Sequence, residues 1–570
     1  MTLVDCGDGV RLERGVRCRM SDGVHLVSDH YYPPGPGPFP TLLMRQPYGR
    51  DIASTVVYAH PIWFARHGYH VVIQDVRGRG DSEGDFYPFR HERQDGAETI
   101  AWLRTHPQCN GRIGMYGFSY QGLTQWLAAA EQPEGLVCIA PGMTACDLYH
   151  GWFYRNGALR LTSTLAWGIQ LLRPDVRRKG LREASDALEA VWSNVRAQPG
   201  FVPYGEHPLL QREDLPEYLR DWIANDRPGP YWESLDVSRD LHRIAVPALH
   251  VSGWFDTYLS GSIDGFLALT RHAATGFARD NQYLIAGAWI HIPWGDRIGN
   301  ENFGPEALLD TDALLLRWFN HWLKDSMEWA DHPKVLHFVL GDNQWQSAAS
   351  FPASGSAPIL DLCLRSGGKA NARKGDGVLA PGPPPEVEPR DIFVYDPEVP
   401  VLAPGGPLAL SGPHDQAEME LGNNLLVYTG EPLGHRLHIF GIPRITLYAA
   451  TSAPGADFTA KLVRVLPDGR AQFLCIGVAR SAYLFPHYEP DVVQRWEFDL
   501  DPTSCVLFPG ERLRLEIASS AFPLYDRNAS TLAPPSQASH WNWQRSTQQI
   551  LHTREHPSAL HLPVAEENRP

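Results

Sequence analysis

The stretch Ile113-Gly-Met-Tyr-Gly-Phe-Ser-Tyr-Gln-Gly122 decides the fold of the first half of this 570-residue chain. Its apolar start is typical of a strand, and the following Leu123-Thr-Gln-Trp-Leu-Ala-Ala-Ala130 is compatible with a helix. Ser119 therefore stands on a tight strand-to-helix turn, where small neighbours leave its hydroxyl exposed and the helix N-terminus favours negative charge. This context indicates a nucleophilic serine; the alternative is a glycine-rich turn with an incidental serine.

Short apolar runs alternate with amphipathic stretches on the N-terminal side of this turn. Thr41-Leu-Leu-Met44 and His70-Val-Val-Ile-Gln74 indicate strands, and Ile62-Trp-Phe-Ala-Arg66 between them indicates a helix. Strand–helix–strand alternation with short connections predicts an α/β fold with a parallel sheet. Leu26 to Tyr32, before a turn rich in proline and glycine, predicts a strand of an initial antiparallel portion.

Two later changes of pattern divide the chain. Charges opposite an apolar stripe, as in Leu181-Arg-Glu-Ala-Ser-Asp-Ala-Leu-Glu-Ala-Val-Trp192, indicate an inserted helical segment. Beyond about Val335, short β-branched or alternating runs between Gly, Pro and Asp turns predict an all-β sandwich. We expect an α/β catalytic domain over 1–145 and 237–330, a helical cap over 146–236 and an all-β domain over 331–570.

Composition narrows the classes of partner. Fifty Lys and Arg against 65 Asp and Glu give a net charge of −15, which repels phosphate backbones and anionic membranes, so neither nucleic acid nor a membrane is an expected partner. The eight cysteines have no C-x-x-C pair, which predicts buried free thiols and no metal site. The sequence begins without an apolar leader and has no apolar run long enough to cross a membrane, so we predict a cytoplasmic protein. Assembly into a homo-oligomer is an alternative that the sequence does not decide.

A serine hydroxyl needs an imidazole to take its proton and a carboxylate to orient that imidazole, in the α/β-hydrolase chain order Ser, acid, His. Asp256 follows the strand-like Ala248-Leu-His-Val-Ser252, at the strand end where such sheets place functional groups; a helix N-cap is the alternative role. His291 is the first histidine after Asp256 on a strand-exit loop. Ser119, Asp256 and His291 are the predicted catalytic triad.

The tetrahedral intermediate also needs donors for its oxyanion. The backbone N–H of Tyr120, directly after the nucleophile, is one candidate. The hydroxyl of Tyr48 is the second, because Tyr48 ends the strand that begins at Thr41, at the same edge of the predicted sheet. A packing role is the alternative for Tyr48.

Several ordered motifs carry a family resemblance. They are Met20-Ser-Asp-Gly-Val24, Arg45-Gln-Pro-Tyr-Gly-Arg50, Asp75-Val-Arg-Gly-Arg-Gly-Asp-Ser-Glu-Gly84, Gly117-Phe-Ser-Tyr-Gln-Gly122, Gly253-Trp-Phe-Asp256, Ala288-Trp-Ile-His291, Asp457-Phe-Thr-Ala-Lys-Leu-Val-Arg-Val-Leu-Pro-Asp-Gly-Arg470, Phe522-Pro-Leu-Tyr-Asp-Arg-Asn528 and His556-Pro-Ser-Ala-Leu560. With them the chain resembles, over nearly its whole length, the cocaine esterase / X-prolyl dipeptidyl aminopeptidase family of serine hydrolases, which includes α-amino acid ester hydrolases and certain cephalosporin acylases.

The resemblance implies an α/β-hydrolase domain with a helical cap and a C-terminal jelly roll, working without a cofactor. It also implies the triad Ser119, Asp256 and His291, with Tyr48 and Tyr120 as the oxyanion hole. Two positions depart from the pattern. Gln121 stands where the generic G-x-S-x-G motif has its second glycine, and Ala288 stands where members commonly have proline, which affects local loop shape.

Aromatic residues near the triad suggest the nature of the substrate. The segment ending at Trp152 and the helix with Trp167 look like segments that line the acyl pocket of cocaine esterases. With Phe255, Tyr258 and Trp289 beside the triad, they suggest a pocket for an aromatic or bulky acyl group; cap packing is the alternative.

The leading hypothesis is hydrolysis of a small-molecule ester or amide through an acyl-enzyme on Ser119. An aminopeptidase-like or α-amino acid ester hydrolase is the second, and it requires carboxylates that bind a substrate ammonium group. The cap offers Glu206, Glu213, Asp214, Glu217, Asp221 and Glu233. A binding protein that keeps an inert hydrolase fold is the third.

Overall fold

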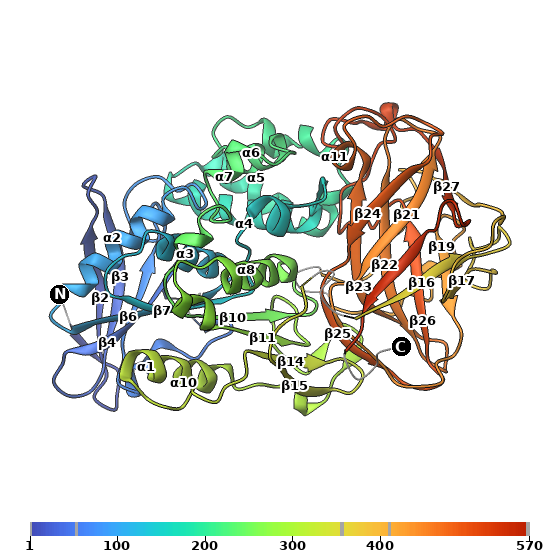
Figure 1. Ribbon diagram of the computed structural model, residues 1–570. Helices are drawn as coiled ribbons and strands as arrows, with labels where there is room; N and C mark the ends of the chain where they lie inside the picture. The colour runs from blue at the N-terminus through green and yellow to red at the C-terminus, as the bar shows by residue number, and fades with distance from the viewer. Residues whose placement is uncertain (1–2, 52–54, 354–357, 408–411, 566–570) are drawn as a thin grey trace.

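The protein is described by a computed structural model that covers residues 3–51, 55–353, 358–407 and 412–565 (Figure 1). The ends of the expected domain ranges, residues 1–2 and 566–570, lie outside these described residues. The α/β part lies at one end of the molecule, the β-sandwich at the other, and the helices of the cap lie above the sheet between them (Figure 1). The predicted fold class is confirmed.

The first sheet has 11 strands in the order β1-β2-β3-β5-β4-β6-β7-β10-β11-β14-β15. Their bounds are β1 (Leu3–Asp5), β2 (Arg11–Arg19), β3 (His25–Tyr32), β4 (Phe39–Gln46), β5 (His70–Asp75), β6 (Cys109–Phe118), β7 (Leu136–Gly142), β10 (Ala248–Gly253), β11 (Gln282–Gly287), β14 (Val335–Val339) and β15 (Gln344–Ala348). The strands from β5 to β14 in this order run parallel, whereas β1–β3 and β15 pair antiparallel at the two edges.

Helices cover both faces of this sheet (Figure 1). On one face lie α1 (Pro61–Arg66) and α10 (Thr311–Lys324), and on the other lie α2 (Glu92–Arg104), α3 (Tyr120–Ala130) and α8 (Leu259–His272), with the short α9 (Gly276–Asp280) after α8. Successive residues of β5 point to opposite cores: Val71 and Ile73 pack with the α1–α10 side, and Val72 packs with the α2–α3 side. Burial on both faces explains why this strand is a continuous apolar run.

The cap is built mainly of helices and short turns. It contains η2 (Tyr149–Phe153), β8 (Tyr154–Arg155), β9 (Ala158–Leu159), α4 (Leu161–Arg178), α5 (Arg182–Trp192), η3 (Val195–Gly200), η4 (Tyr204–Glu206), η5 (Pro208–Gln211), α6 (Tyr218–Ala224) and α7 (Pro230–Glu233), and η6 (Leu241–Arg243) leads back to the sheet. Leu165, Ile169, Leu172 and Val176 recur at helical spacing on α4 and are buried, so this face anchors the cap.

The C-terminal part is a β-sandwich. Its larger sheet has the order β18-β27-β21-β28-β16-β17-β19-β26-β22-β23, with β24 paired to β21, and β20 pairs with β25 in a smaller sheet. The elements are β16 (Ile359–Arg365), β17 (Val378–Ala380), β18 (Asp391–Tyr395), η8 (Met419–Leu421), β19 (Leu426–Gly430), β20 (Leu437–Gly441), β21 (Arg444–Thr451), β22 (Asp457–Val465), β23 (Ala471–Arg480), α11 (Ser481–Leu484), β24 (Gln494–Asp499), β25 (Thr503–Leu507), β26 (Arg512–Ala518), η9 (His540–Asn542), β27 (Ser546–Leu551) and β28 (Ala559–Pro563).

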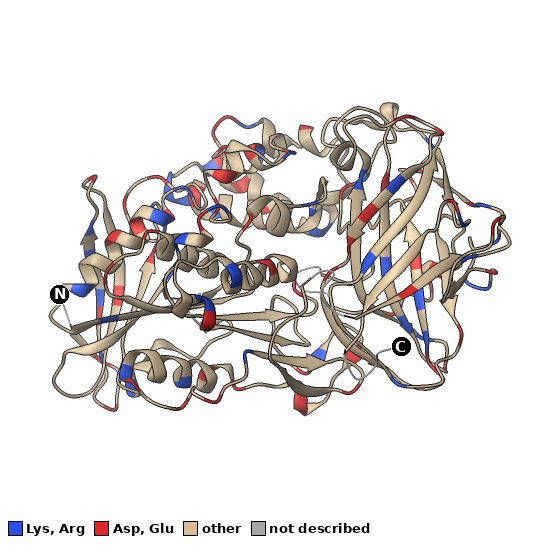
Figure 2. Cartoon of the chain, in the orientation of Figure 1, with Lys and Arg blue, Asp and Glu red and all other residues tan. Residues whose placement is uncertain are grey.

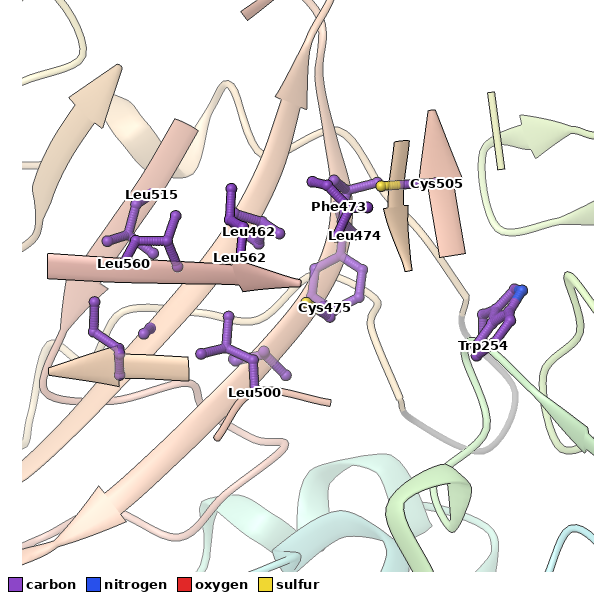
Figure 3. Close-up of a cluster of buried hydrophobic side chains, with 14 of the residues drawn as sticks. Trp254, Leu462, Phe473, Leu474, Cys475, Leu500, Cys505, Leu515, Leu560 and Leu562 are labelled. Carbon is purple, nitrogen blue, oxygen red and sulfur yellow. The ribbon is translucent and has the colours of Figure 1, made fainter. Parts of the chain in front are cut away.

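The core of the sandwich continues into the α/β part. Leu462, Phe473 and Leu515 lie inside the sandwich, and Trp254 of the α/β part belongs to the same buried cluster (Figure 3). The first sheet also extends past the expected boundary at residue 330, because β14 pairs with β11 and β15 pairs with β14. A bridge between Leu340 and Cys505 then joins this edge to the sandwich, so the two parts share a continuous interface.

A buried charged network fastens the sandwich to the cap. Arg480 binds Asp457 and Asp526 through its guanidinium, with N···O distances of 2.8 Å to each carboxylate. Asp526 in turn accepts hydrogen bonds from the amide of Leu159 (2.9 Å) and the hydroxyl of Tyr204 (2.8 Å), both in the cap. The ion pairs lie within the sandwich, and the two hydrogen bonds to Asp526 attach the cap to them.

The structure also shows where the charged residues and the cysteines lie. Acidic and basic residues are intermixed over all three parts of the molecule (Figure 2). All eight cysteines are free thiols, and all except the half-buried Cys6 are buried. In the described part of the chain, no helix has both the length and the apolar character that crossing a bilayer requires.

Candidate active site

Ser119 occupies the turn between β6 and α3 in a strained conformation. Its φ of +61° and ψ of −126° lie in a region that residues with a side chain rarely adopt. Its amide donates to the carbonyl of Gly142 at 2.8 Å, which ties the turn to the end of β7. This geometry aims the side chain away from the sheet at the start of a helix, as a nucleophile requires.

Close packing explains the unusual glycine spacing around Ser119. A Cβ on Gly122 would lie 2.8 Å from the Cβ of Thr144 and 2.9 Å from the carbonyl oxygen of Gly142, so position 122 has no room for a side chain. Gln121, in contrast, uses its side chain: its Oε1 accepts a hydrogen bond from the amide of Phe118 at 3.3 Å. The departure from G-x-S-x-G is therefore a different way of holding the same turn.

Asp256 and His291 meet beyond the ends of neighbouring strands. Asp256 follows β10 and His291 follows β11, and these two strands are parallel and adjacent. The Nδ1 of His291 donates to Oδ1 of Asp256 at 2.8 Å, and both residues are buried. Because the buried carboxylate accepts at Nδ1, the Nε2 atom keeps a lone pair for a proton. Asp256 does not cap α8: the residue at that helix N-cap is Tyr258, which makes no capping bond.

Ser119 has His291 on one side and Tyr48 on the other. The ring of Phe118, the preceding residue, lies 5.4 Å from the imidazole of His291 between centroids. On the other side, the hydroxyl of Ser119 acts on the Tyr48 phenol and lowers its pKa. Among the described residues, no direct hydrogen bond joins Ser119 to His291, and such contacts commonly tighten only when a substrate binds.

Tyr48 lies just beyond β4 and faces Ser119. Its phenol oxygen accepts a hydrogen bond from Nε1 of Trp167 at 3.1 Å. Burial raises the pKa of Tyr48 to about 12, against the opposing effects of Trp167, Arg79 and Ser119. Tyr48 thus stays protonated at neutral pH, and its proton is available to a substrate oxygen.

Tyr120 supplies a backbone donor at the same place. As the first residue of α3, it presents one of the N–H groups that a helix leaves without an intrahelical acceptor. Its side chain is fixed by a hydrogen bond and an ion pair: the Tyr120 hydroxyl donates to Glu92 at 2.8 Å, and Glu92 pairs with Arg45 at 2.7 Å. Arg45 lies in a motif noted in the sequence, whereas nothing in the sequence pattern indicated Glu92 as its partner.

Three of the five predicted acyl-pocket residues come together beside the triad. The rings of Trp152 and Tyr258 stack at 4.1 Å, and Trp152 lies 5.3 Å from Trp167. Tyr258 contacts the imidazole of His291 edge to face at 5.1 Å. Phe89, which the sequence analysis did not single out, stacks on Tyr120 at 4.5 Å and joins this aromatic group.

Phe255 and Trp289, the other two predicted acyl-pocket residues, make their ring contacts elsewhere. Phe255 stacks on Phe303 at 6.0 Å, towards the sandwich. Trp289 stacks on Trp294 at 5.5 Å and donates its Nε1 to the carbonyl of Ala307. Among the described ring contacts, neither has one with the pocket tryptophans or Tyr258. Nearness to the triad in sequence does not fix the direction in which a side chain points.

The candidate ammonium-binding carboxylates of the cap are mostly exposed or already paired. Four of them are exposed: Glu206, Glu213, Asp214 and Glu217. The remaining two already have partners, since Asp221 accepts from the Tyr87 hydroxyl at 2.6 Å and Glu233 pairs with Arg239.

Comparisons with known proteins agree with this fold. The X-Pro dipeptidyl-peptidase (S15 family) matches residues 22–293, and the C-terminal non-catalytic domain of X-Pro dipeptidyl-peptidase matches residues 327–561. A cocaine esterase from Rhodococcus sp. (strain MB1 Bresler) is 33% identical over 569 residues, covering 96% of this chain and 97% of that protein.

Solved structures match over nearly the whole chain. An aminopeptidase from the marine sediment archaeon Thaumarchaeota archaeon has a TM-score of 0.82 at 24% identity, and an α-amino acid ester hydrolase has 0.78 at 23%. Each covers 99% of this chain and 98% of its own, and at these identities the likeness concerns the fold. The chain is a serine hydrolase of the α/β type. It belongs to the X-Pro dipeptidyl-peptidase (S15) family.

Proposed function

We propose that this protein hydrolyses small-molecule carboxylic esters through an acyl-enzyme on Ser119, with His291 as the base and Asp256 as its orienting carboxylate. The observation that carries the proposal is the 2.8 Å bond between Asp256 and His291, beside a serine held in a strained turn. Amides are the second bond type that this chemistry accommodates.

The proposed reaction uses only groups already described. The Oγ of Ser119 attacks the carbonyl carbon while Nε2 of His291 takes the hydroxyl proton. The resulting oxyanion accepts hydrogen bonds from the Tyr48 hydroxyl and the Tyr120 amide. Collapse expels the alcohol, which receives the proton from His291. A water molecule then attacks the acyl-enzyme with His291 again as base, and the acid leaves as Ser119 regains its proton.

The clustered rings of Trp152, Trp167 and Tyr258 support a preference for substrates with an aromatic acyl group. Burying about 100 Å² of such a group is worth roughly 2.5 kcal/mol, or between one and two powers of ten in kcat/KM over an acetyl group. Acetyl, phenylacetyl and α-aminoacyl esters of one chromogenic alcohol test this preference. Turnover of the aromatic ester no faster than the acetate would refute the aromatic pocket, and a preference for the aminoacyl ester would favour an amino-acid ester hydrolase.

Labelling by a fluorophosphonate tests the nucleophile. We expect one label per chain in the wild type and none in Ser119→Ala, which should also lose ester turnover while keeping its melting temperature. Ser185→Ala, on a half-buried position of cap helix α5, is the control and should label like the wild type. Turnover in Ser119→Ala above a tenth of the wild-type rate would show that another residue is the nucleophile.

The setting of the enzyme is also proposed. The net charge of −15 and the intermixed surface charges support a protein that acts in the cytoplasm on small molecules, without nucleic acid or membrane as partner. Sedimentation equilibrium measures whether it works as a monomer or as a homo-oligomer.

A further inference from the structure

Three histidines form a cluster at the edge of the sheet opposite the triad. His30 lies on β3, His70 is the first residue of β5, and His106 follows α2. One ring nitrogen from each lies within 4.8 Å of the others. Thr41 pairs with His70 at the beginning of β4, whereas Tyr48 lies beyond the end of that strand. The cluster therefore takes no part in ester hydrolysis.

The rings are oriented as metal ligands are. The Nδ1 of His30 and the Nε2 of His70 face each other at 2.9 Å. The outer nitrogen of His30 lies 2.9 Å from the hydroxyl of Ser28, and that of His70 lies 3.3 Å from the hydroxyl of Thr41. Hydrogen bonds to the outer nitrogens of metal-binding histidines fix the ring and its tautomer in this way. Tetrahedral ligands about 2.0–2.1 Å from a zinc ion lie about 3.3 Å apart, so the inner nitrogens need to separate only slightly.

The two nitrogens of an imidazole also suit this arrangement. Each neutral ring carries one proton, which can lie on the outer nitrogen and leave the inner lone pair for the metal.

The three histidines differ in their exposure to solvent. His30 and His70 are fully buried, whereas His106 is half-buried. The Nδ1 of His106 accepts a 3.3 Å bond from the amide of Gln108, and ligation through its other nitrogen gives up this long contact.

We propose that His30, His70 and His106 form a structural site for a divalent transition-metal cation of the zinc type, with water in the fourth position. Imidazole nitrogens favour zinc, copper and nickel over calcium and magnesium. The site would join β3, β5 and the segment after α2, and thereby stabilise the N-terminal part of the sheet.

The experiment uses the full-length protein after treatment with a chelator and dialysis. Zinc binding is measured by calorimetry and by metal analysis, and Co²⁺ serves as a spectroscopic probe of tetrahedral nitrogen coordination. We expect one tightly bound Zn²⁺ per chain, a melting temperature that rises with Zn²⁺ concentration, visible bands of tetrahedral Co²⁺, and unchanged ester turnover.

Two variants separate this site from adventitious surface binding. His106→Gln, at the accessible ligand, should weaken zinc binding by at least about tenfold. His272→Gln removes an exposed histidine from the end of α8 and should bind zinc like the wild type. Equal zinc binding by wild type and His106→Gln would overturn the proposal. If His106→Gln does not fold, the Co²⁺ spectrum of the wild-type protein still tests the proposal. The absence of tetrahedral Co²⁺ bands at stoichiometric metal would show that the three histidines are joined by hydrogen bonds alone.

Discussion

The indole Nε1 of Trp167 donates a hydrogen bond to the phenol oxygen of Tyr48 at 3.1 Å. This bond links cap helix α4 to the proposed oxyanion donor of the α/β domain. Trp167 is itself fixed by stacking on Trp222 of α6 at 5.1 Å, with the rings nearly parallel at 4°. Aromatic packing within the cap therefore orients the proposed oxyanion donor.

Removing the Tyr48 hydroxyl should affect catalysis more than binding. We expect Tyr48→Phe to lower kcat by roughly 10²- to 10³-fold with little change in KM, because the donor acts on charge that develops in the transition state. Steady-state kinetics with a nitrophenyl ester measure the change. Tyr31→Phe, a buried tyrosine of β3, is the control and should retain the wild-type kcat. A change confined to KM would place Tyr48 in ground-state binding.

The hydrogen bond from Trp167 can be removed with most of the ring kept. Trp167→Phe should lower kcat by about three- to tenfold, the value of one hydrogen bond, because Tyr48 loses its fixed orientation. Trp222→Phe is a matched control, since Nε1 of Trp222 has no hydrogen-bond partner among the described residues. Equal effects of the two variants on kcat would mean that cap packing, and not the bond to Tyr48, is responsible.

Asp236 should make stability depend on pH. Burial, assisted by the charge of Asp147, raises the pKa of Asp236 from 3.8 to about 7. The folded protein thus holds this proton more tightly than the unfolded chain. The resulting stabilisation is complete below about pH 3.8 and is lost as the pH rises through 7, with a slope of up to about 1.4 kcal/mol per pH unit.

Asp236→Asn removes this titration and keeps an oxygen that can accept from Ser238. The variant should gain stability relative to the wild type as the pH rises from about 4 to about 8. Urea unfolding across that range measures the difference. The exposed Asp186→Asn is the control and should follow the wild type at every pH. Parallel wild-type and Asp236→Asn curves would contradict the assignment.

Arg480→Met should destabilise the junction of cap and sandwich. The substitution leaves the buried carboxylates of Asp457 and Asp526 without their cation, which costs about 3–5 kcal/mol. Arg495→Met breaks the exposed pair with Glu497 and should cost no more than about 1 kcal/mol. Chemical denaturation measures the free energy of unfolding of the wild type, Arg480→Met and Arg495→Met. Similar losses of this free energy in the two variants would show that the buried network contributes little to stability.

The sequence was sufficient for features that follow from local pattern and chain order. Asp256 and His291 were identified because each follows a strand-like run, in the expected order after Ser119, and the structure places those two strands side by side. The turn at Ser119 was likewise visible from its glycines and the helix that follows.

Features that depend on how distant segments pack together could not be predicted from the sequence. Trp167 was placed near the site, but its bond to Tyr48 depends on the position of the whole cap. Phe255 follows the strand as predicted, yet its ring turns towards the sandwich. His30 and His70 are 40 residues apart, and only the placement of β5 beside β3 brings them together.

The network around Asp526 has a consequence for how the enzyme is made. A ribosome delivers Leu159 and Tyr204 long before it reaches Asp526, their hydrogen-bond acceptor. The growing polypeptide therefore contains Ser119, Asp256 and His291, the proposed triad, before the acceptor of these two cap hydrogen bonds is made. A chain that ends before residue 526 keeps the proposed triad but lacks these two hydrogen bonds to the cap. Such a shortened chain should therefore hold its cap less firmly than the full-length protein does.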